Sequence, residues 1–569
     1  MSRMPYSTVT KLLRRIHGAM QRSERTGIPP REILEQDLEL RRRLAQEHVQ
    51  RQARRRFLMQ AGLAGAALGV GGLARKVAAA GSGDRGGRDP GRVAIIGAGA
   101  GGLRTAHRLH QYGWASTVYE ANTRIGGRMY SNSDYFTGGR VVEWGGELIS
   151  TEHTSLRNLA HQLNLELEDA NKSSVGEEEV YLIDGVLRSE ADLLAEWLGG
   201  LYELVKRAQQ EAPWQPFYNA YTEAHRKYDW TEAGDWLAAN GIGRDRWVHK
   251  LLMSDLVSEY GLIDNNSALN LIYLLGWSTR RSGGLPLAGT DERFHVVGGN
   301  DRVIHAMAAE LPPGTVQMGK ALVAVRGEPA GPYTLAFADG SQAECDQLVF
   351  AMPYHLIRNV DFDARLWNSF SAPKRAAIAN IKPADNGKLQ LEFASRYYDV
   401  ARVVSGQLVH LSAVSYSDIG TARAPGFIST WEGNPRSPSE LGIIVNYTGG
   451  YAGETLRDAT AIPGAQAPYF GQAAGKDVAR VLADFDKIWP GIKSQYTGRA
   501  LVSNWWDNPY SRGAFISPDI GAMTSWWGAQ LEREGNIHFA GEACDVEYWS
   551  YMNGAIRSGE RVAQEIAQG

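Results

Sequence analysis

A glycine-rich turn beginning at Gly97 has the residue types and spacing of a dinucleotide-binding site. The buried-strand pattern RVAIIG runs directly into GAGAGG, and the helical stretch LRTAHRLHQYG follows. In such a turn Gly97 would allow the tight bend, Gly99 would let the backbone approach a pyrophosphate, and Gly102 would let the helix pack on the strand. The N–H groups at a helix start also favour an anion. We therefore predict a phosphate site here, with a chance glycine-rich turn as the alternative.

The next predicted strand, STVYEA, supplies an acid at the position where a dinucleotide presents its ribose. This acid is Glu120, and a carboxylate there can accept hydrogen bonds from the ribose hydroxyls. An acid rather than an arginine argues against the 2′-phosphate of NADP. The combined pattern predicts a site for FAD or NAD.

Four residues of the segment after Glu120, NTRIGGRMYS, favour FAD over NAD. They are Arg124, Gly126, Gly127 and Arg128. A second glycine turn that carries arginines suits a longer, bent cofactor whose phosphates need cationic contacts. An ordinary polar loop is the alternative interpretation.

Two further segments offer room for the flavin end of such a cofactor. VVEWGGELIS contains Gly145 and Gly146, where the backbone could approach an isoalloxazine ring, and Glu147 follows them. Near the C-terminus the predicted strand HFA enters a turn at Gly541 and Glu542. The helix NGAIRSGERVAQEI then provides a second helix N-terminus. We expect all five residues to be cofactor-binding.

The composition is that of a globular protein and leaves little room for metal or disulfide chemistry. The chain has 569 residues, of which 43% are hydrophobic and 22% charged. Its two cysteines, Cys345 and Cys544, cannot form a disulfide framework or a four-thiolate metal site, and no metal is expected. Of the formal net charge of −3, residues 1–91 carry +10, which leaves −13 on residues 92–569. A nucleic-acid partner is therefore not expected.

The basic leader resembles a twin-arginine export signal. Arg54 and Arg55 precede a Phe-Leu pair, a Gly/Ala-rich apolar run and an A-x-A sequence at 78–80. A basic amphipathic helix running into a linker is the alternative. The charged stretch 31–56 is predicted to be helical, and its role is open. No other apolar run reaches the ~20 residues of a membrane span. We expect a soluble mature protein that is periplasmic or secreted.

The motifs together resemble those of the flavin-dependent amine oxidase superfamily, and most of all the bacterial L-amino-acid oxidases. The matching segments are GAGAGG, YEA, RIGGR, EWGGE, FAGEA and NGAIRSGERVA. The resemblance implies an α/β fold in which a Rossmann-type FAD-binding domain is interleaved with a substrate domain of mixed sheet and helices. Family members also suggest a homodimer.

The resemblance also implies domain boundaries, because each domain of this superfamily is built from non-contiguous segments. The leader would be residues 1–91. The FAD-binding domain would comprise 92–156, 291–372 and 500–569, and a cofactor contact is expected near Val323. The substrate domain would comprise 157–290 and 373–499, the first helical and the second rich in strands.

The same resemblance assigns the catalytic side chains. Lys388 matches the lysine that holds a water near flavin N5, with a solvated strand-edge lysine as the alternative. Phe515, Trp549 and Tyr551 would be aromatic walls of the substrate site, although any of them could be core residues. Tyr551 would also be a cofactor-binding residue. Ala514 occupies the position of the flavin-linking cysteine of some monoamine oxidases, so non-covalent FAD is expected.

The leading hypothesis for function is an FAD-dependent oxidase of L-amino acids that uses O₂ and releases hydrogen peroxide. The alternatives are an oxidase of primary amines or polyamines, and a desaturase or isomerase on the same fold. Many amino-acid oxidases of the superfamily bind the substrate carboxylate with an arginine, and Leu148 stands at that position here. Arg512 is our candidate to replace it, since a guanidinium can bind a carboxylate bidentately. A surface position is the alternative for Arg512.

Overall fold

The structure is a computed structural model. It describes residues 8–30, 32–34, 36, 91–169, 178–261, 265–276, 292–418, 426–433 and 440–569. The twin-arginine segment and most of the charged stretch 31–56 lie outside the described residues.

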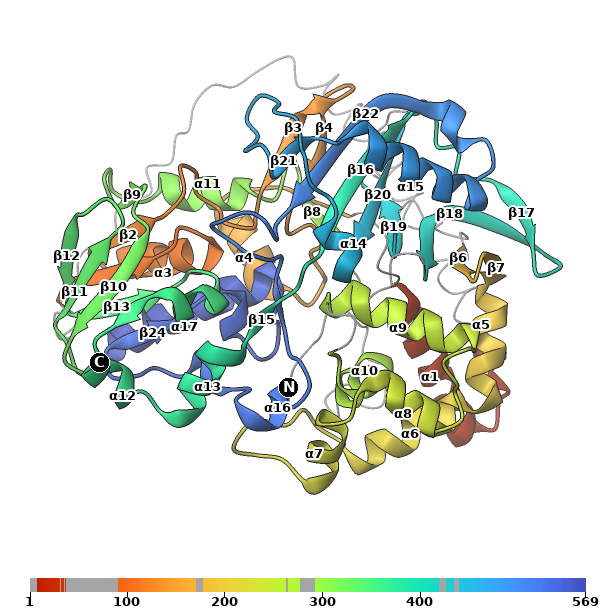
Figure 1. The fold of residues 1–569 in the computed structure, drawn as a ribbon, viewed down its shortest axis with the longest axis horizontal. Helices are drawn as coiled ribbons and strands as arrows, with labels where there is room; N and C mark the ends of the chain where they lie inside the picture. The colour runs from red at the N-terminus through yellow and green to blue at the C-terminus, as the bar shows by residue number, and fades with distance from the viewer. Residues whose placement is uncertain are drawn as a thin grey trace, which may run out of the picture.

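A five-stranded parallel sheet forms one side of the molecule (Figure 1). Its strands, in spatial order, are β24 (Ile537–Phe539), β13 (Gln347–Phe350), β1 (Val93–Ile96), β2 (Ser116–Glu120) and β9 (Val316–Met318). All four residues of β1 are buried, as expected for a central parallel strand covered on both faces. The helices α3 (Ala100–Gln111) and α17 (Met552–Gln568) pack against each other beside this sheet.

Glycines permit the tight packing at the start of α3. Gly97 has a φ of +108°, and a Cβ on it would lie 2.7 Å from the Ala351 carbonyl oxygen. A Cβ on Gly102 would lie 2.0 Å from the oxygen of Gly97. A side chain at either position would clash with a backbone oxygen that cannot move away. Both positions therefore need glycine for the strand, the turn and the helix to follow one another.

A nine-stranded sheet forms the upper right part of Figure 1. Along its path lie β21 (Phe470–Gln472), β22 (Tyr496–Asn504), β16 (Gly387–Phe393), β20 (Gly442–Thr448), β19 (Ser429–Glu432), β18 (Gln407–Ser417), β6 (Glu178–Ile183) and β7 (Val186–Ser189), and β17 (Ala401–Val404) pairs with β18. The sheet is antiparallel except for the β18–β6 pair. Thus β6 and β7 come from a segment that otherwise reads as helical, and β22 crosses the predicted boundary at 500.

Smaller sheets complete the strands of the described part. A four-stranded sheet contains β12 (Gln342–Cys345), β11 (Tyr333–Phe337), β10 (Leu322–Gly327) and β14 (Asp361–Phe362). Three pairs are β3 (Ser131–Phe136) with β4 (Arg140–Glu143), β5 (Leu167–Asp169) with β8 (Phe294–Val296), and β15 (Lys382–Pro383) with β23 (Ile516–Ser517).

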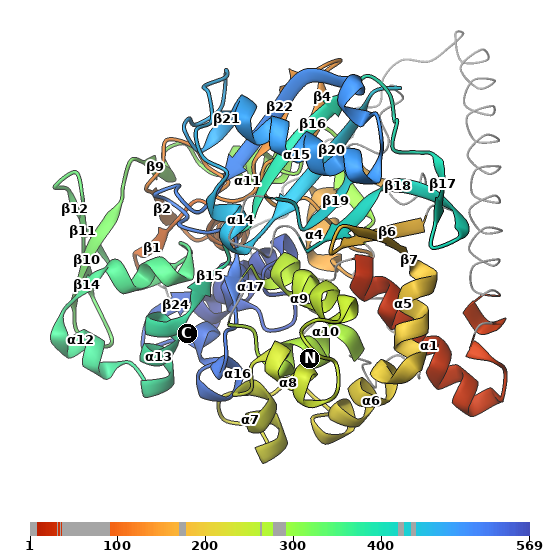
Figure 2. The same ribbon diagram turned by 45° about the vertical axis from the view of Figure 1, so that its right-hand side comes forward.

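Helices fill the lower part of the molecule and border both large sheets (Figures 1 and 2). The lower group is α5 (Glu190–Glu196), α6 (Tyr202–Glu211), α7 (Glu223–Asp229), α8 (Ala233–Ala239), α9 (Trp247–Tyr260) and α10 (Ala268–Gly276). The others are α4 (Thr154–Gln162), α11 (Arg302–Ala309), α12 (Ala364–Ser369), α13 (Ala372–Asn380), α14 (Gly450–Glu454), α15 (Gly475–Ile488) and α16 (Ala522–Ser525). The mixed α/β architecture confirms the predicted fold class.

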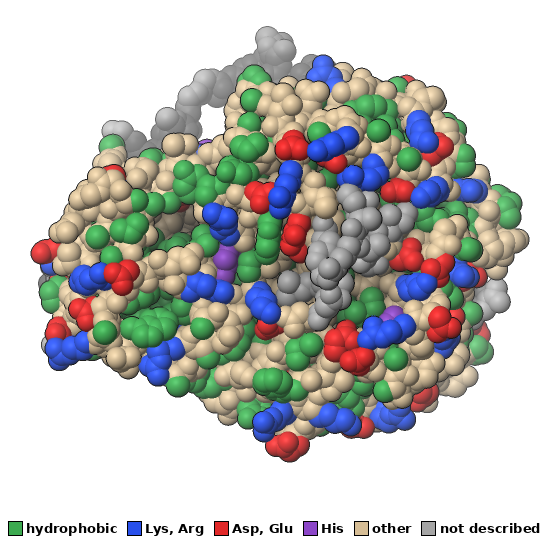
Figure 3. Space-filling view, in the orientation of Figure 1, with side chains coloured by type: hydrophobic (Ala, Val, Ile, Leu, Met, Phe, Trp, Pro, Cys, Tyr) green, Lys and Arg blue, Asp and Glu red, His purple; other side chains and the backbone are tan. Residues whose placement is uncertain are grey.

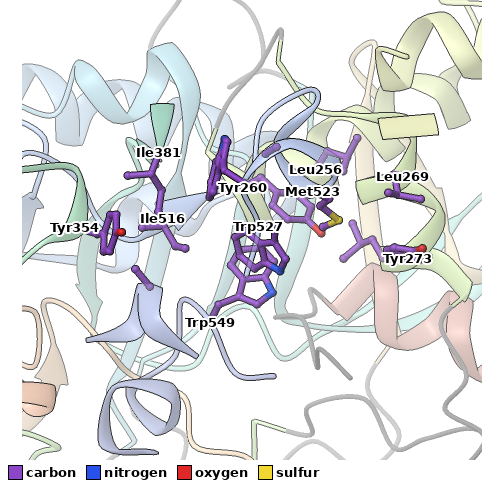
Figure 4. Packing of buried hydrophobic residues seen from close by; sticks show 14 of the residues in the cluster. Leu256, Tyr260, Leu269, Tyr273, Tyr354, Ile381, Ile516, Met523, Trp527 and Trp549 are labelled. Carbon is purple, nitrogen blue, oxygen red and sulfur yellow. The ribbon is translucent and has the colours of Figure 1, made fainter. Parts of the chain in front are cut away.

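The largest hydrophobic cluster joins the lower helices to the C-terminal segments. Figure 4 shows Trp527 and Trp549 beside each other, next to Tyr260 at the end of α9. The rings of Tyr260 and Trp549 stack at a centroid distance of 5.8 Å, and Trp527 meets Trp549 edge-on at 5.3 Å. All three side chains are buried, so this aromatic cluster fixes α9 against the segment that precedes α17.

The surface of the described part mixes both signs of charge. On the face shown in Figure 3, Lys and Arg side chains alternate with Asp and Glu, and no band of one sign crosses that face. Among the described residues, no helix is both long enough and apolar enough to cross a bilayer.

The helix α1 (Thr8–Thr26), upstream of the leader's arginines, packs on the lower helices (Figure 2). Its Ile16 and Ala19 are 1% and 0% exposed, and Ile16 belongs to the largest hydrophobic cluster. Glu24 accepts a hydrogen bond from the Tyr202 hydroxyl at 3.2 Å and one from Lys206 Nζ at 2.5 Å. Residues on the N-terminal side of the expected export signal therefore belong to the core.

We expect Ile16→Ala to lower the free energy of unfolding by about 2–5 kcal/mol, because it leaves a cavity where α1 meets the core. The thermal unfolding midpoint of the full-length protein measures this. Ile28→Ala is the matched control, since Ile28 is only partly buried beyond the end of α1. Equal midpoints for the two variants would show that α1 is not packed in solution.

Candidate active site

One cavity of about 830 Å³ brings together most of the residues singled out from the sequence. Its size is at the upper end of what ligand sites usually have. The sequence-predicted residues on its wall are Gly97, Gly99, Glu120, Arg124, Gly126, Gly127, Arg128, Gly145, Gly146, Glu147, Lys388, Arg512, Phe515, Gly541, Glu542 and Tyr551. The cavity thus extends from the carboxyl end of β2 to the nine-stranded sheet.

Three predicted residues lie away from this wall. Gly102 is behind it, in contact with Gly97. Val323 is 42% exposed, and the preceding residues Ala321 and Leu322 line the cavity instead. Trp549 is fully buried in the aromatic cluster, so its position here is that of a packing residue. For Trp549, the sequence could not distinguish a core position from a wall position, because a large aromatic ring suits both equally.

The cavity end near β2 has the features of a dinucleotide site. Glu120 is 8% exposed, and its carboxylate accepts hydrogen bonds from the backbone N–H of Ala98 at 2.7 Å and of Asn122 at 2.8 Å. Burial raises the pKa of Glu120, and these backbone N–H groups oppose that rise. The carboxylate is therefore held rigidly beside the glycine turn, with acceptor capacity left for a ligand hydroxyl.

Two glycines on the cavity wall have open space in front of them. A Cβ on Gly99 or Gly541 would meet no protein atom within 4 Å. Gly99 has an ordinary φ of −77° and caps the N-terminus of α3, so neither its backbone nor its packing demands glycine. A side chain there would instead project in front of the free N–H groups of the helix. This geometry fits a pyrophosphate.

The two arginines of the second glycine turn are held by the protein itself. Arg124 donates to Gln466 Oε1 at 3.1 Å and to the Gly127 carbonyl at 2.8 Å. Arg128 donates to both carboxylate oxygens of Glu542, at 3.1 and 3.0 Å. Both guanidinium groups are therefore held in place at the cavity wall, and the Arg128–Glu542 pair joins the second glycine turn to the C-terminal one.

The opposite end of the cavity is built around a buried ion pair. Lys388 lies on β16, in which all seven residues are buried. Its Nζ donates to Glu147 Oε2 at 2.6 Å, and Glu147 Oε1 accepts from Trp431 Nε1 at 3.0 Å. The Trp431 and Tyr447 rings are 5.2 Å apart, and both line the cavity with Phe515 and Tyr551. The arrangement provides one charged pair among aromatic walls.

The backbone beneath this pair is held by buried side chains. Asn300 Nδ2 donates to the carbonyl oxygens of Gly146 and Glu147, at 3.1 and 2.7 Å. The Asn300 N–H donates to Glu143 Oε1 at 2.8 Å. Burial raises the pKa of Glu143 to about 8. A Cβ on Gly145 would lie 1.9 Å from the Arg128 carbonyl oxygen, so glycine is required there.

Trp431 and Tyr447 were not singled out by the sequence reasoning. They lie on β19 and β20, which are neighbours in the nine-stranded sheet. Their position on the cavity depends on the pairing of β20 with β16, in which Lys388 is opposite Tyr447. The only local signal was an aromatic residue inside a strand pattern, and many strands have one.

Arg512 is an exposed residue at the cavity wall, between the buried residues Ser511 and Gly513. Its φ is +48°, and its N–H donates to the Asn508 carbonyl at 2.8 Å. The other cations on the wall, Arg124, Arg128, Lys320 and Lys388, each donate to protein acceptors. Within the described residues no such partner is found for the Arg512 guanidinium.

Neither cysteine is placed for attachment of a cofactor. Cys345 and Cys544 are buried outside the cavity wall, and burial raises the pKa of each thiol to about 12. Among the described residues, no group of His, Cys, Asp and Glu side chains could hold a metal ion.

A family model described as flavin containing amine oxidoreductase matches residues 100–567, so the chain belongs to that family. The family implies a flavin cofactor and an oxidoreductase that acts on amines, which confirms the resemblance drawn from the motifs. An L-amino-acid oxidase of Mus musculus is 24% identical over 499 residues, covering 84% of this chain and 71% of the relative. An L-amino acid dehydrogenase of Synechocystis is 22% identical over 487 residues, covering 83% and 94%.

Solved structures show the same fold. Cyclohexylamine oxidase from Brevibacterium oxydans has a TM-score of 0.66 at 20% identity, covering 84% of this chain and 99% of that one. Putrescine oxidase bound to putrescine has a TM-score of 0.64 at 20% identity, covering 84% and 98%.

We expect Gly99→Ala to weaken cofactor binding roughly tenfold or more while the protein folds normally, because the new methyl group meets only the space in front of α3. Flavin retained on dilution, together with the unfolding midpoint of the cofactor-free protein, measures both effects. Gly475→Ala is the matched control: Gly475 is exposed at the start of α15, and its Cβ would also meet no atom. Equal flavin retention in the two variants would remove Gly99 from the site.

Proposed function

We propose that this protein is an FAD-dependent oxidase that deaminates L-amino acids to 2-oxo acids, ammonia and hydrogen peroxide. Bound FAD would accept a hydride equivalent from the carbon that bears the amine and would pass the two electrons to O₂, which becomes hydrogen peroxide. Water would then hydrolyse the resulting imine to the 2-oxo acid and ammonia. Amine chemistry follows from the family. The choice of amino acids rests on one observation: Arg512 lies on the cavity wall, and its guanidinium has no acceptor among the described residues.

The chain's own side chains would position the substrate and exclude water. Trp431, Tyr447, Phe515 and Tyr551 present flat apolar surfaces to the cavity. Such surfaces favour the neutral amine over the ammonium form, because an apolar environment disfavours charge. At the wall, Arg512 would bind the carboxylate through its planar fork. The relatives named as acting on L-amino acids support this choice.

The proposed FAD is non-covalent. Ala514 carries no nucleophile, and its carbonyl accepts a hydrogen bond from Arg128 at 2.9 Å. Both thiols are buried elsewhere. We therefore expect acid or heat denaturation to release the yellow cofactor into the supernatant. Flavin absorbance that stays with the precipitated chain would contradict this assignment.

Peroxide release across a panel of L-amino acids and their decarboxylated amines tests the function. We expect L-amino acids to give the higher kcat/KM. Activity on amines alone would instead identify an amine oxidase, and no peroxide with any amine would favour a desaturase or isomerase on this fold.

Arg512→Met tests the carboxylate assignment within the same panel. We expect kcat/KM for L-phenylalanine to fall roughly ten- to a hundredfold, because a charge-assisted hydrogen bond is lost. For phenethylamine, which lacks the carboxylate, kcat/KM should change little. Arg499→Met serves as the control, since Arg499 donates to the Tyr135 carbonyl and does not line the cavity. An equal loss on both substrates would rule out carboxylate recognition by Arg512.

A further inference from the structure

Arg124 is a partly buried cation on the cavity wall, and its hydrogen-bond acceptors among the described residues are neutral. Its N–H groups donate to Gln466 Oε1 at 3.1 Å, and to the carbonyl oxygens of Ile125 at 3.3 Å and Gly127 at 2.8 Å. A guanidinium has five N–H donors in total, so about two remain for a ligand. Burial lowers the pKa of Arg124, so its charged form gains from an anion placed nearby. The protein contacts thus fix the direction of this guanidinium without a directly bound carboxylate.

Gln466 is the acceptor that comes from a distant part of the sequence, 342 positions away. Its Oε1 also accepts from Asn122 Nδ2 at 3.2 Å, and its Nε2 donates to Asn122 Oδ1 at 2.7 Å. The Asn122 N–H in turn donates to the Glu120 carboxylate at 2.8 Å. Arg124 and Asn122 line the cavity, whereas Gln466 is not on its wall. One side-chain amide behind the wall therefore holds two wall residues in a fixed arrangement.

The loop 461–469 delivers Gln466 from the nine-stranded sheet. At its base the backbones of Thr460 and Gln472 exchange two hydrogen bonds of 2.9 Å, and Gln472 lies on β21. At its tip the Gln466 carbonyl accepts from the Phe470 N–H at 3.0 Å. Because both base and tip are fixed, the position of the amide is set by the nine-stranded sheet.

Two contacts dock this loop on the segment that follows the second glycine turn. The Tyr130 hydroxyl donates to the Gly464 carbonyl, and Phe470 packs edge-on against the Tyr130 ring at a centroid distance of 5.5 Å. The same ring faces the Arg124 guanidinium, whose Cζ lies 4.0 Å from the ring centroid. Arg124 therefore contacts both sides of the junction between the loop and the glycine turn.

We propose that Gln466 is a positioning residue for the FAD cofactor: its neutral amide holds Arg124 and Asn122 toward the dinucleotide end of the cavity without cancelling the Arg124 charge. A carboxylate in the same place would orient the guanidinium equally well and would neutralise it. The phosphates of FAD are anions, so an unpaired cation attracts them more strongly than a paired one. The inference rests on the proposed FAD and is independent of which amine is oxidised.

Gln466→Glu separates this role from packing alone. The substitution keeps the shape and the acceptor for Arg124, and it adds the negative charge that the proposal forbids. We expect the dissociation constant of FAD to rise roughly tenfold or more, because the guanidinium is then paired within the protein. Fluorescence of the FAD released on dilution of the loaded enzyme measures this. A dissociation constant equal to that of the parent would overturn the proposal.

Gln466→Met removes the hydrogen bonds of the amide and adds no charge. We expect the dissociation constant of FAD to rise only about three- to tenfold, because Arg124 loses its direction and keeps its charge. The unfolding midpoint of the cofactor-free protein should be no lower in Gln466→Glu than in Gln466→Met. A larger loss of FAD affinity in Gln466→Met than in Gln466→Glu would show that the amide acts only through packing, against the proposal.

Gln472→Glu is the matched control. Gln472 is exposed at the base of the same loop and does not line the cavity, so this variant makes the same change of charge away from Arg124. Its FAD affinity should equal that of the parent. An equal loss in Gln472→Glu and Gln466→Glu would assign the effect to the net charge of the loop and overturn the role of Gln466.

Tyr130→Phe tests delivery by the loop without any change at Gln466. It removes the hydroxyl that docks the Gly464 carbonyl and keeps the ring beside Arg124. We expect FAD affinity to fall severalfold, because the loop is held less firmly. If the Gln466 variants do not fold, this variant decides, and an FAD affinity equal to that of the parent would then overturn the proposal.

The outcomes separate this inference from the proposed function. The substrate panel decides the function, and FAD binding decides the role of Gln466, so either can fail alone. If the flavin stays with the denatured chain, only the non-covalent assignment fails, and the flavin content of the purified chains replaces the dissociation constant. A content that falls from the parent and Gln472→Glu to Gln466→Met and then Gln466→Glu would support the proposal. Equal contents would overturn it.

Discussion

A positive charge inside a buried sheet is the constraint on which the cavity depends. Lys388 lies on a strand whose residues are all buried, so its ammonium must be compensated within the protein. The compensation comes from the 143–147 segment, which belongs to a distant part of the sequence. Removing either partner of such a pair costs about 3–5 kcal/mol, because the other charge is left buried and alone. The pair thereby ties the nine-stranded sheet to the segment after β4.

At the other end of the cavity, close contacts between backbone atoms hold distant segments together. A Cβ on Gly101 would lie 2.7 Å from the Gly541 nitrogen, and one on Gly559 would lie 2.5 Å from the Gly101 oxygen. These contacts bring α3, α17 and the turn after β24 together at the carboxyl ends of the parallel strands. Gly99 differs, because no protein atom restricts it. One turn thus contains both glycines that packing requires and a glycine, Gly99, that packing does not require.

The cations on the cavity wall are of two kinds, those with a carboxylate partner and those without one. Arg128 and Lys388 each form an ion pair with a carboxylate. Each pair therefore adds little net charge to the cavity wall. Arg512 has no such partner among the described residues and is itself exposed. The proposed amino-acid substrate is a zwitterion, and in that proposal Arg512 would meet its carboxylate, because opposite charges attract across a site.

The sequence by itself determined the parts of this protein that depend on local order. A strand, a glycine turn and a helix are neighbours in the chain, so GAGAGG and Glu120 could be recognised from spacing alone, and the family motifs located Lys388, Phe515 and Tyr551 on one cavity. It could not distinguish a wall residue from a core residue, as Trp549 shows. The Lys388–Glu147 pair joins residues 241 positions apart, and Trp431 reaches it through strand pairing. Only the tertiary structure decided these contacts, because strand register and the packing of distant segments bring together side chains that no local pattern connects.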